Sequence, residues 1–238
     1  MLNFKKLKKF YSNFLDIIYP PLCFNCKEKL TENSILCEKC KNLLLLVDDE
    51  QCFVCEKKLA VDGICSDCKK KFLFDGFVTA FRFNEIIQTL IHNFKYNEYK
   101  KIGDYLSSFL VKKILEHNFV PFIDYIIPVP LHKVKKRARG FNQSLIIAQS
   151  IHNILQIPLA DSVIRRKRFT KTQTNLTRTE RQRNVAQAFE INKDEFVTDK
   201  NLLLIDDVFT TGSTLASMTN ELKSGGAKNI YCATLARA

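Results

Sequence analysis

The stretch Leu202-Leu-Leu-Ile-Asp-Asp-Val-Phe-Thr-Thr-Gly-Ser-Thr214 decides the fold of this chain. Its four apolar residues predict a buried strand, and Asp206 and Asp207 follow at the carboxyl end of that strand. A hydroxyl-rich turn comes next, and residues 215–223 then have the pattern of a helix. In an open α/β sheet, the crevice beyond the strand ends is where ligands bind. The stretch therefore predicts both a sheet and the place of its site.

The chemistry of the turn favours a phosphate and a diol. The turn offers backbone N–H groups, hydroxyls and the positive end of a helix dipole to a phosphate. The two adjacent carboxylates can accept hydrogen bonds from vicinal hydroxyls. A phosphate and a diol a few ångströms apart describe a ribose 5-phosphate. The alternative is a strand with an acidic end and an ordinary helix N-cap, and the strand–turn–helix context favours the ligand site.

This order of residues resembles the 5-phosphoribosyl-1-pyrophosphate (PRPP) signature of type I phosphoribosyltransferases. The resemblance implies that Asp206 and Asp207 meet the ribose 2- and 3-hydroxyls. It also implies that the 5-phosphate is cradled by Thr210, Thr211, Gly212, Ser213 and Thr214.

Length and composition set the class of protein. The chain has 238 residues, 46% of them hydrophobic, which fits a globular protein of one or two domains. No apolar run approaches the roughly 20 residues that span a bilayer. Residues 1–20 predict an amphipathic helix packed on its own protein, with a helix on a membrane surface as the alternative. Because this segment does not have the pattern of a signal peptide, we expect a cytoplasmic protein, with the inner face of the membrane as a place of action still open.

The positive charge is concentrated in one part of the sequence. The net charge is +12, and residues 131–185 hold thirteen lysines and arginines against Asp161 and Glu180, which gives that window +11. Charge of one sign at this density indicates a polyanionic partner, and pyrophosphate and nucleic acid both qualify. A solvated basic face is the alternative.

Eight of the nine cysteines form four Cys-x-x-Cys pairs, a spacing typical of zinc sites. Nothing indicates secretion, and a redox motif would occur once rather than four times. Two pairs complete a tetrahedron, so we expect two structural zinc ions. Sequential pairing is favoured by the shorter loops, and a crossed arrangement stays open. The proposed ligands are Cys23, Cys26, Cys37 and Cys40 for one ion, and Cys52, Cys55, Cys65 and Cys68 for the other.

The chain after residue 71 alternates between strand and helix patterns. Strands are predicted over 77–83, 125–130, from 163, over 202–205 and over 230–235, and helices over 85–94, 102–115, 144–155 and 215–223. Alternating elements indicate an α/β domain with a parallel sheet flanked by helices. The predicted domains are thus 1–20, a small double zinc ribbon over 21–71, and an α/β domain over 76–238. Cys232 is expected to be a buried strand residue.

Three further motifs carry a resemblance to a whole family. They are Pro-Val-Pro-Leu-His (128–132), Arg-Gly-Phe-Asn-Gln (139–143), and Thr-Gln-Thr-Asn-Leu (172–176) with Arg-Gln-Arg-Asn (181–184). Together with the double zinc ribbon, they look like the ComF family, the amidophosphoribosyltransferase-like proteins associated with natural transformation. The resemblance covers nearly the whole chain after about residue 20 and implies a type I phosphoribosyltransferase-like fold.

By that resemblance, a second loop would hold the pyrophosphate of PRPP, and it consists of Val129, Pro130, Leu131, His132 and Lys133. Residues 165–183 would form a hood over the site. The cations expected to face the hood or a nucleic acid are Arg137, Arg139, Arg165, Arg166, Lys167, Arg168 and Lys171. Mg2+ is expected with PRPP, bridging pyrophosphate oxygens.

Three functions remain open at this point. The first is a PRPP-binding protein of DNA uptake that acts with single-stranded DNA and the uptake machinery. The second is an active phosphoribosyltransferase on an unidentified small acceptor, in which Asp206 and Asp207 would be the catalytic groups. The third is a PRPP-responsive regulator. Purine-salvage enzymes carry an Asp base where this chain has Thr210, so a hypoxanthine or guanine acceptor is not expected.

Overall fold

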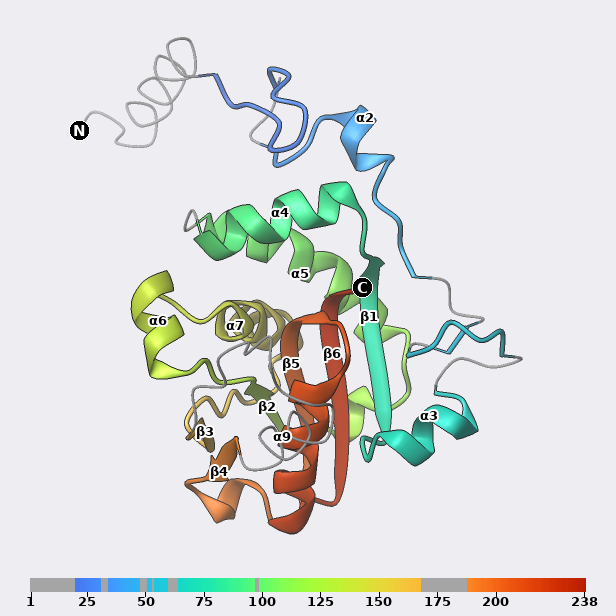
Figure 1. Ribbon diagram of the computed structural model, residues 1–238, viewed down its shortest axis with the longest axis vertical. Helices are drawn as coiled ribbons and strands as arrows, with labels where there is room; N and C mark the ends of the chain where they lie inside the picture. The colour runs from blue at the N-terminus through green and yellow to red at the C-terminus, as the bar shows by residue number, and fades with distance from the viewer. Residues whose placement is uncertain are drawn as a thin grey trace, which may run out of the picture.

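The computed structural model describes residues 20–30, 34–47, 51–52, 54–59, 64–96, 99–167 and 188–238. Its centre is a four-stranded parallel sheet in the order β1-β6-β5-β2 (Figure 1). These strands are β1 (Gly76–Arg82), β2 (Tyr125–Pro128), β5 (Asn201–Phe209) and β6 (Asn229–Arg237). The predicted α/β class, with a parallel sheet between helices and a preceding cysteine-rich segment, is confirmed.

Helices cover both faces of the sheet and give three layers. One face carries α4 (Glu85–Tyr96), α5 (Lys100–Leu115) and α7 (Gln143–Leu155), and α9 (Ser213–Ser224) lies on the other, with its lower part in front of the sheet in Figure 1. Helix α4 forms because its apolar residues recur at helical spacing and all become buried, at positions 86, 87, 90, 91 and 94. Helix α9 ends at Ser224, just before the predicted glycine stop at 225–226.

The two central strands are apolar on both sides, as a buried parallel sheet requires. The side chains of Leu202 to Ile205 are all 0% exposed, and Cys232 is also fully buried, as predicted. Burying each of these large side chains stabilises the fold by about 1.5–3 kcal/mol. The sheet therefore holds β5 rigidly up to the point where its acidic residues begin.

The structure departs from the sequence prediction at two elements. The strand predicted from Val163 does not join the parallel sheet, because β3 (Ile164–Arg166) pairs antiparallel with β4 (Phe189–Ile191) in a separate two-stranded sheet. Between residues 131 and 143, where no helix was predicted, the structure has helix α6 (Lys133–Arg139). Its basic sequence has no apolar stripe from which a helix could be predicted.

The remaining elements are short. They are α2 (Glu38–Lys41), α3 (Ser66–Lys71), η1 (Val120–Phe122) and η2 (Asp194–Phe196). No helix in the described part of the chain is both long and apolar enough to cross a membrane. The predicted amphipathic helix over 1–20 falls almost entirely on residues 1–19, outside the described residues.

The cysteine-rich segment is joined to the edge of the sheet between its two halves. Leu46 forms an antiparallel bridge with Phe81 of β1. On either side, the Val47 amide donates to the Ala80 carbonyl at 3.0 Å, and the Arg82 amide donates to the Leu45 carbonyl at 2.9 Å. The β1 edge, which would otherwise expose unpaired backbone groups, is therefore partly covered.

Candidate phosphosugar and zinc sites

The acidic pair lies inside β5 rather than beyond its end. The prediction ended the strand at residue 205, but β5 continues to Phe209 because β6 keeps pairing with it, Asp206 opposite Thr234 and Val208 opposite Ala236. On its other side, β5 loses its partner earlier, since β2 ends at Pro128 opposite Ile205. The two carboxylates thus lie just past the end of a neighbouring strand, where parallel sheets form ligand crevices.

Each carboxylate of the pair has its own partners. The Asp206 carboxylate (Oδ1) accepts hydrogen bonds from the Ser144 hydroxyl at 3.0 Å and from the Asp207 backbone amide at 2.9 Å. The Asp207 carboxylate forms a 2.6 Å salt bridge with Lys95, and the two side chains are only 14% and 20% exposed. Burial, together with the adjacent Asp207 charge, raises the pKa of Asp206 to about 7.

The turn after β5 presents hydroxyls and the start of a helix. Gly212 is the N-cap of α9, has φ +71°, and accepts the first helical hydrogen bond from the Ala216 amide at 2.8 Å. The hydroxyls of Thr211 and Ser213 lie 3.0 Å apart, and both residues are exposed. Thr210 is also exposed and Thr214 half-buried. A twelve-residue helix opening on exposed hydroxyls is suited to an anion.

A cluster of phenylalanines supports the turn from below. A Cβ atom added to Gly212 would lie 2.6 and 2.7 Å from ring carbons of Phe209 and 2.7 Å from a ring carbon of Phe72. The rings of Phe72 and Phe209 are 5.9 Å apart, and Phe77 packs on Phe209 at 4.7 Å. Glycine is therefore needed at this position for its positive φ and for its lack of a side chain.

The predicted second loop starts beside the acids. The Val129 amide donates to the Ile205 carbonyl at 2.8 Å, and the Asn142 side chain donates to the Val129 carbonyl at 3.0 Å. Residues 130–132 are half-buried, and the His132 ring accepts from the Val134 amide at 3.3 Å as α6 begins. Lys133 is the first residue of α6, and its side chain lies outside the described part. The loop thus leaves β2 at the level of the acidic pair.

The basic residues are less uniform than the sequence suggested. Glu190 of β4 forms ion pairs with Arg165 and with Lys167, the latter at 2.7 Å, so an acidic residue outside the basic window neutralises part of it. Arg166 lies over the Phe189 ring at 5.5 Å. Burial lowers the pKa of Arg166, and the nearby Asp206 charge offsets part of that effect.

The other basic residues that were predicted to face the hood or a nucleic acid have different surroundings. Arg139 contacts the Tyr96 ring at 5.2 Å and donates to the Gln143 side chain at 3.1 Å, while Arg137 is exposed. Arg168 and Lys171 lie outside the described residues, as does most of the predicted hood. Phe141, an aromatic residue close to these cations in the sequence, packs against Phe94 at the edge of the core.

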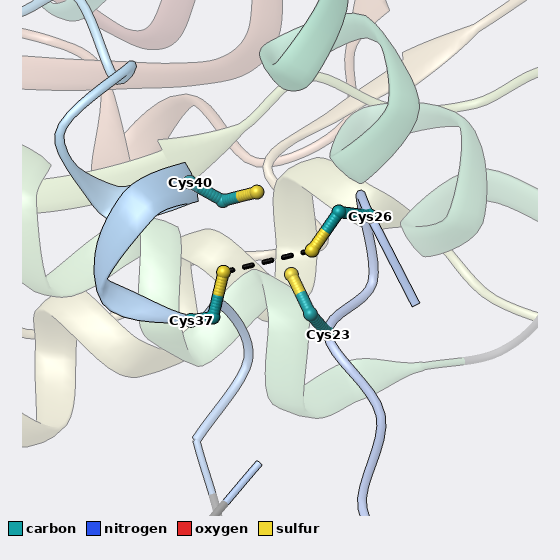
Figure 2. Close-up of side chains that lie close together, drawn as sticks. All are labelled: Cys23, Cys26, Cys37 and Cys40. Atoms are coloured by element: carbon teal, nitrogen blue, oxygen red, sulfur yellow. Dashed lines mark hydrogen bonds between the residues drawn. The ribbon is translucent and has the colours of Figure 1, made fainter. Parts of the chain in front are cut away.

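The cysteines come together in sequential groups of four. Figure 2 shows Cys23, Cys26, Cys37 and Cys40 with their sulfur atoms pointing toward one another, and Cys26 and Cys37 are 3.6 Å apart. Cys52, Cys55, Cys65 and Cys68 form the second group, and within each group all sulfur atoms lie within 4.8 Å of one another. Four thiolates bound tetrahedrally to zinc are about 3.8 Å apart, so both groups fit that ion. The sequential arrangement is confirmed and the crossed one is not found.

The surroundings of the sulfur atoms also suit a zinc ion. The Asn25 side-chain amide donates to the Cys40 sulfur, and the Cys65 amide donates to the Cys52 sulfur, both at 3.3 Å. Although burial raises the pKa of Cys23 and Cys52, hydrogen bonds from backbone amides bring them down to about 6 and about 7. Thiolates held in this way are the form that binds zinc, and such donors orient the ligands.

The second cysteine group is connected to the site-bearing sheet at two places. Arg237, at the end of β6, donates to the Cys52 carbonyl at 3.0 Å and forms a 2.6 Å salt bridge with Glu56. Helix α3 carries Cys68 and leads directly into Phe72, whose amide donates to the Cys68 carbonyl. The Phe72 ring is one of the two rings that lie against Gly212. This cysteine group and the hydroxyl-rich turn therefore share one packed core.

Sequence reasoning missed two residues of this site, Lys95 and Ser144. Ser144 directly follows the Arg-Gly-Phe-Asn-Gln motif and could have been suspected from that position. Lys95 belongs to the last turn of α4, far from every motif, and no pattern in the sequence singles it out. Only the fold brings α4 and α7 to the acidic end of β5.

The sheet, the turn and the two cysteine groups define a phosphoribosyltransferase-like protein with a double zinc ribbon. Sequence models of two domains match the chain, the phosphoribosyl transferase domain over residues 142–238 and the double zinc ribbon domain over residues 14–69. Competence protein F of Haemophilus influenzae is 33% identical over 159 residues, which cover 65% of this chain and 69% of that protein. The chain belongs to this family, the ComF family.

Two further relatives have the same kind of name. DNA utilization protein YhgH of Escherichia coli K12 is 31% identical over 154 residues, covering 63% of this chain and 67% of its own length. Competence protein ComFC of Bacillus subtilis is 26% identical over 216 residues, covering 85% of this chain and 84% of its own. The longer match includes the cysteine-rich part.

Proposed function

We propose that this protein binds PRPP with Mg2+ at the β5–α9 crevice and acts in the uptake or use of DNA. The observation that carries the proposal is the arrangement of the β5 end, where two carboxylates precede a glycine N-cap flanked by exposed hydroxyls. The carboxylates suit the ribose hydroxyls, and the turn suits the 5-phosphate. The proposed place of action is the cytoplasmic side of the membrane, where the DNA enters the cell.

Each predicted site residue has a role in this proposal. Asp206 and Asp207 would accept hydrogen bonds from the ribose hydroxyls, and residues 210–214 would bind the 5-phosphate through amides and hydroxyls. The loop from Val129 to Lys133 would face the pyrophosphate, because it leaves β2 beside Asp206. Mg2+ would neutralise the pyrophosphate and so reduce the number of protein cations that the site needs.

Single-stranded DNA is the proposed macromolecular partner, and the relatives' names, which refer to competence and to DNA utilization, support a DNA partner. A cationic surface with few stacking aromatics binds strands weakly and in a salt-dependent manner. Arg137 is exposed, whereas Glu190 offsets Arg165 and Lys167, so modest affinity is expected. Fluorescence anisotropy of a labelled oligonucleotide across a salt series tests this partner, and a lack of binding at low salt would remove it.

Transfer of the phosphoribosyl group is a second candidate, and the Asp206 carboxylate favours it. A group whose pKa is about 7 can exchange a proton at neutral pH, as an acid–base catalyst must. In such a transfer the bond between ribose C1 and pyrophosphate breaks, the acceptor bonds to C1, and pyrophosphate leaves with the bonding electrons. Acceptor-dependent release of pyrophosphate tests this candidate, and a regulator would bind PRPP without that release.

Isothermal titration calorimetry with PRPP and Mg2+ is the direct test of binding. The wild-type protein should bind PRPP, and a variant with Asp206→Asn and Asp207→Asn should not. A second titration with single-stranded DNA present would measure coupling between the two ligands. If the wild type and the double variant bind PRPP equally, the acidic pair is not the site.

A further inference from the structure

Lys95 is a half-buried cation in direct contact with the proposed sugar site. It lies in the last turn of α4, and its ammonium reaches the Asp207 carboxylate (Oδ2) at 2.6 Å. Both side chains are largely buried, at 20% and 14% exposure, so water screens this pair less than a surface pair. Burying an ammonium group costs free energy, and a buried ion pair is therefore weak evidence for a role in stability. A role of this pair in the function of the site is the alternative.

Helix α4 does not depend on Lys95 for its position. Five apolar residues of the helix are buried against the core, among them Leu90 and Phe94 at 0% exposure. Lys95 lies on the polar side of the same turn and extends toward β5. The charge of Lys95 is therefore directed at the acidic pair rather than used to anchor the helix.

The charged and titratable groups around the acids come from several elements. Asp206 and Asp207 adjoin each other on β5, with Lys95 from α4 on Asp207. Arg166 from β3 lies near Asp206, and the thiol of Cys232 on β6 is fully buried nearby. Ser144 from α7 donates a neutral hydrogen bond. Two adjacent carboxylates repel each other, and Lys95 offsets this repulsion through a direct contact.

We propose that Lys95 is a positioning residue that holds the Asp207 carboxylate ready for the hydroxyls of a phosphorylated ribose and, with its positive charge, favours the ionised form of Asp206. This inference rests on the proposed function, since it deepens the role of the same site. Ionised carboxylates accept hydrogen bonds from both hydroxyls of a diol, whereas a protonated one would offer a donor in place of an acceptor. The sugar's affinity would then depend on a lysine outside every sequence motif.

The opposite role makes a different prediction. If Lys95 merely blocked the empty site, a ligand would have to break the ion pair between Lys95 and Asp207. Substitution of Lys95 would then tighten binding of the ligand. If Lys95 only stabilised α4, its removal would weaken binding equally at every pH. The positioning role alone predicts weaker binding at pH 7 that partly recovers at higher pH, together with a change in the pH at which Asp206 ionises.

The first experiment measures ionisation without any ligand. Carbon-13 NMR of the zinc-loaded full chain, labelled at the aspartate carboxyl carbons, would follow the acidic pair from pH 5 to pH 9. Asp206→Asn and Asp207→Asn variants assign the two signals. Lys95→Met should raise the pH of the Asp206 transition, because the Lys95 charge favours the ionised form of Asp206. Lys95→Arg should restore the transition, and an unchanged transition in Lys95→Met would overturn the proposal.

The second experiment measures PRPP affinity in the presence of Mg2+ at pH 7 and pH 9. Lys95→Met should bind PRPP about tenfold more weakly at pH 7 and should regain part of that loss at pH 9, where Asp206 is ionised even without the lysine. Lys101→Met, which removes an exposed lysine of α5, is the matched control and should bind as the wild type does. Tighter binding by Lys95→Met, or an equal loss at both pH values, would contradict the positioning role.

The two experiments separate this inference from the proposed function. A wild-type protein that binds no PRPP at either pH would refute the proposed ligand, while the NMR titration would still report on Lys95. Normal PRPP binding with an unchanged transition in Lys95→Met would refute the inference alone.

Discussion

Replacing Gly212 with alanine tests whether the phenylalanine cluster fixes the hydroxyl-rich turn. Two separate costs arise in the structure. Alanine at φ +71° pays roughly 1–2 kcal/mol for the left-handed backbone. Its Cβ would also lie 2.6–2.7 Å from the rings of Phe209 and Phe72, and such overpacking costs about 1–3 kcal/mol. The variant should therefore lose about 2–5 kcal/mol of unfolding free energy.

Gly226 provides a matched control for this variant. It also has a positive φ, +87°, but the nearest atom to an added Cβ is 3.6 Å away, on Thr198. Gly226→Ala should thus lose only the backbone part, about 1–2 kcal/mol. Urea unfolding of the zinc-loaded chains, followed by circular dichroism, measures both differences.

A second substitution identifies the ring responsible. Phe72→Leu in the Gly212→Ala background removes one of the two close contacts, so the double variant should be more stable than the sum of the single losses predicts. If Gly212→Ala loses no more stability than Gly226→Ala, the packing argument is refuted. The same outcome would leave the second cysteine group without a contact through which to influence the turn.

Three other outcomes follow from the same structure. Asp206→Asn should stabilise the protein at pH 8 by about 1–3 kcal/mol, part of the roughly 4 kcal/mol that a pKa raised from 3.8 to about 7 represents. This gain should shrink as the pH falls from 7 to 4, where the folded protein already binds the proton and the unfolded chain does not, and thermal unfolding across pH would show it. Cys68→Ser should weaken PRPP binding in calorimetry more than Cys40→Ser does, since only Cys68 leads into Phe72; equal losses would contradict the coupling. Arg137→Gln should lower single-stranded DNA affinity and flatten its salt dependence, and an unchanged slope would count against a contact there.

The sequence predicted those helices and strands in which the buried apolar residues recur at a regular spacing. Leu202 to Ile205 is apolar throughout, and α4 repeats its apolar residues at helical spacing, so both were predicted correctly. The end of β5 was not, because it depends on pairing with β6, which no local pattern encodes. Five of the seven residues of helix α6 are basic, and its sequence has no apolar periodicity from which a helix could be predicted.

The residues of the candidate site also fall into a part that the sequence predicted and a part that it did not. The two cysteine groups could be predicted with their sequential arrangement, since ligand spacing follows from the chemistry of zinc. The neutralisation of Arg165 by Glu190 and the salt bridge of Lys95 with Asp207 could not, because each joins residues that only the tertiary fold brings together. Motifs thus located the crevice, and the fold supplied the charges around it.

The central claim is that the acidic pair and the turn of β5–α9 form a binding site for a phosphorylated ribose. Calorimetric titration of the zinc-loaded protein with PRPP and Mg2+ at pH 8 tests it most directly. One molecule of PRPP should bind per chain, with no binding to the Asp206→Asn, Asp207→Asn variant. Equal heats from both proteins, or none from the wild type, would contradict the claim.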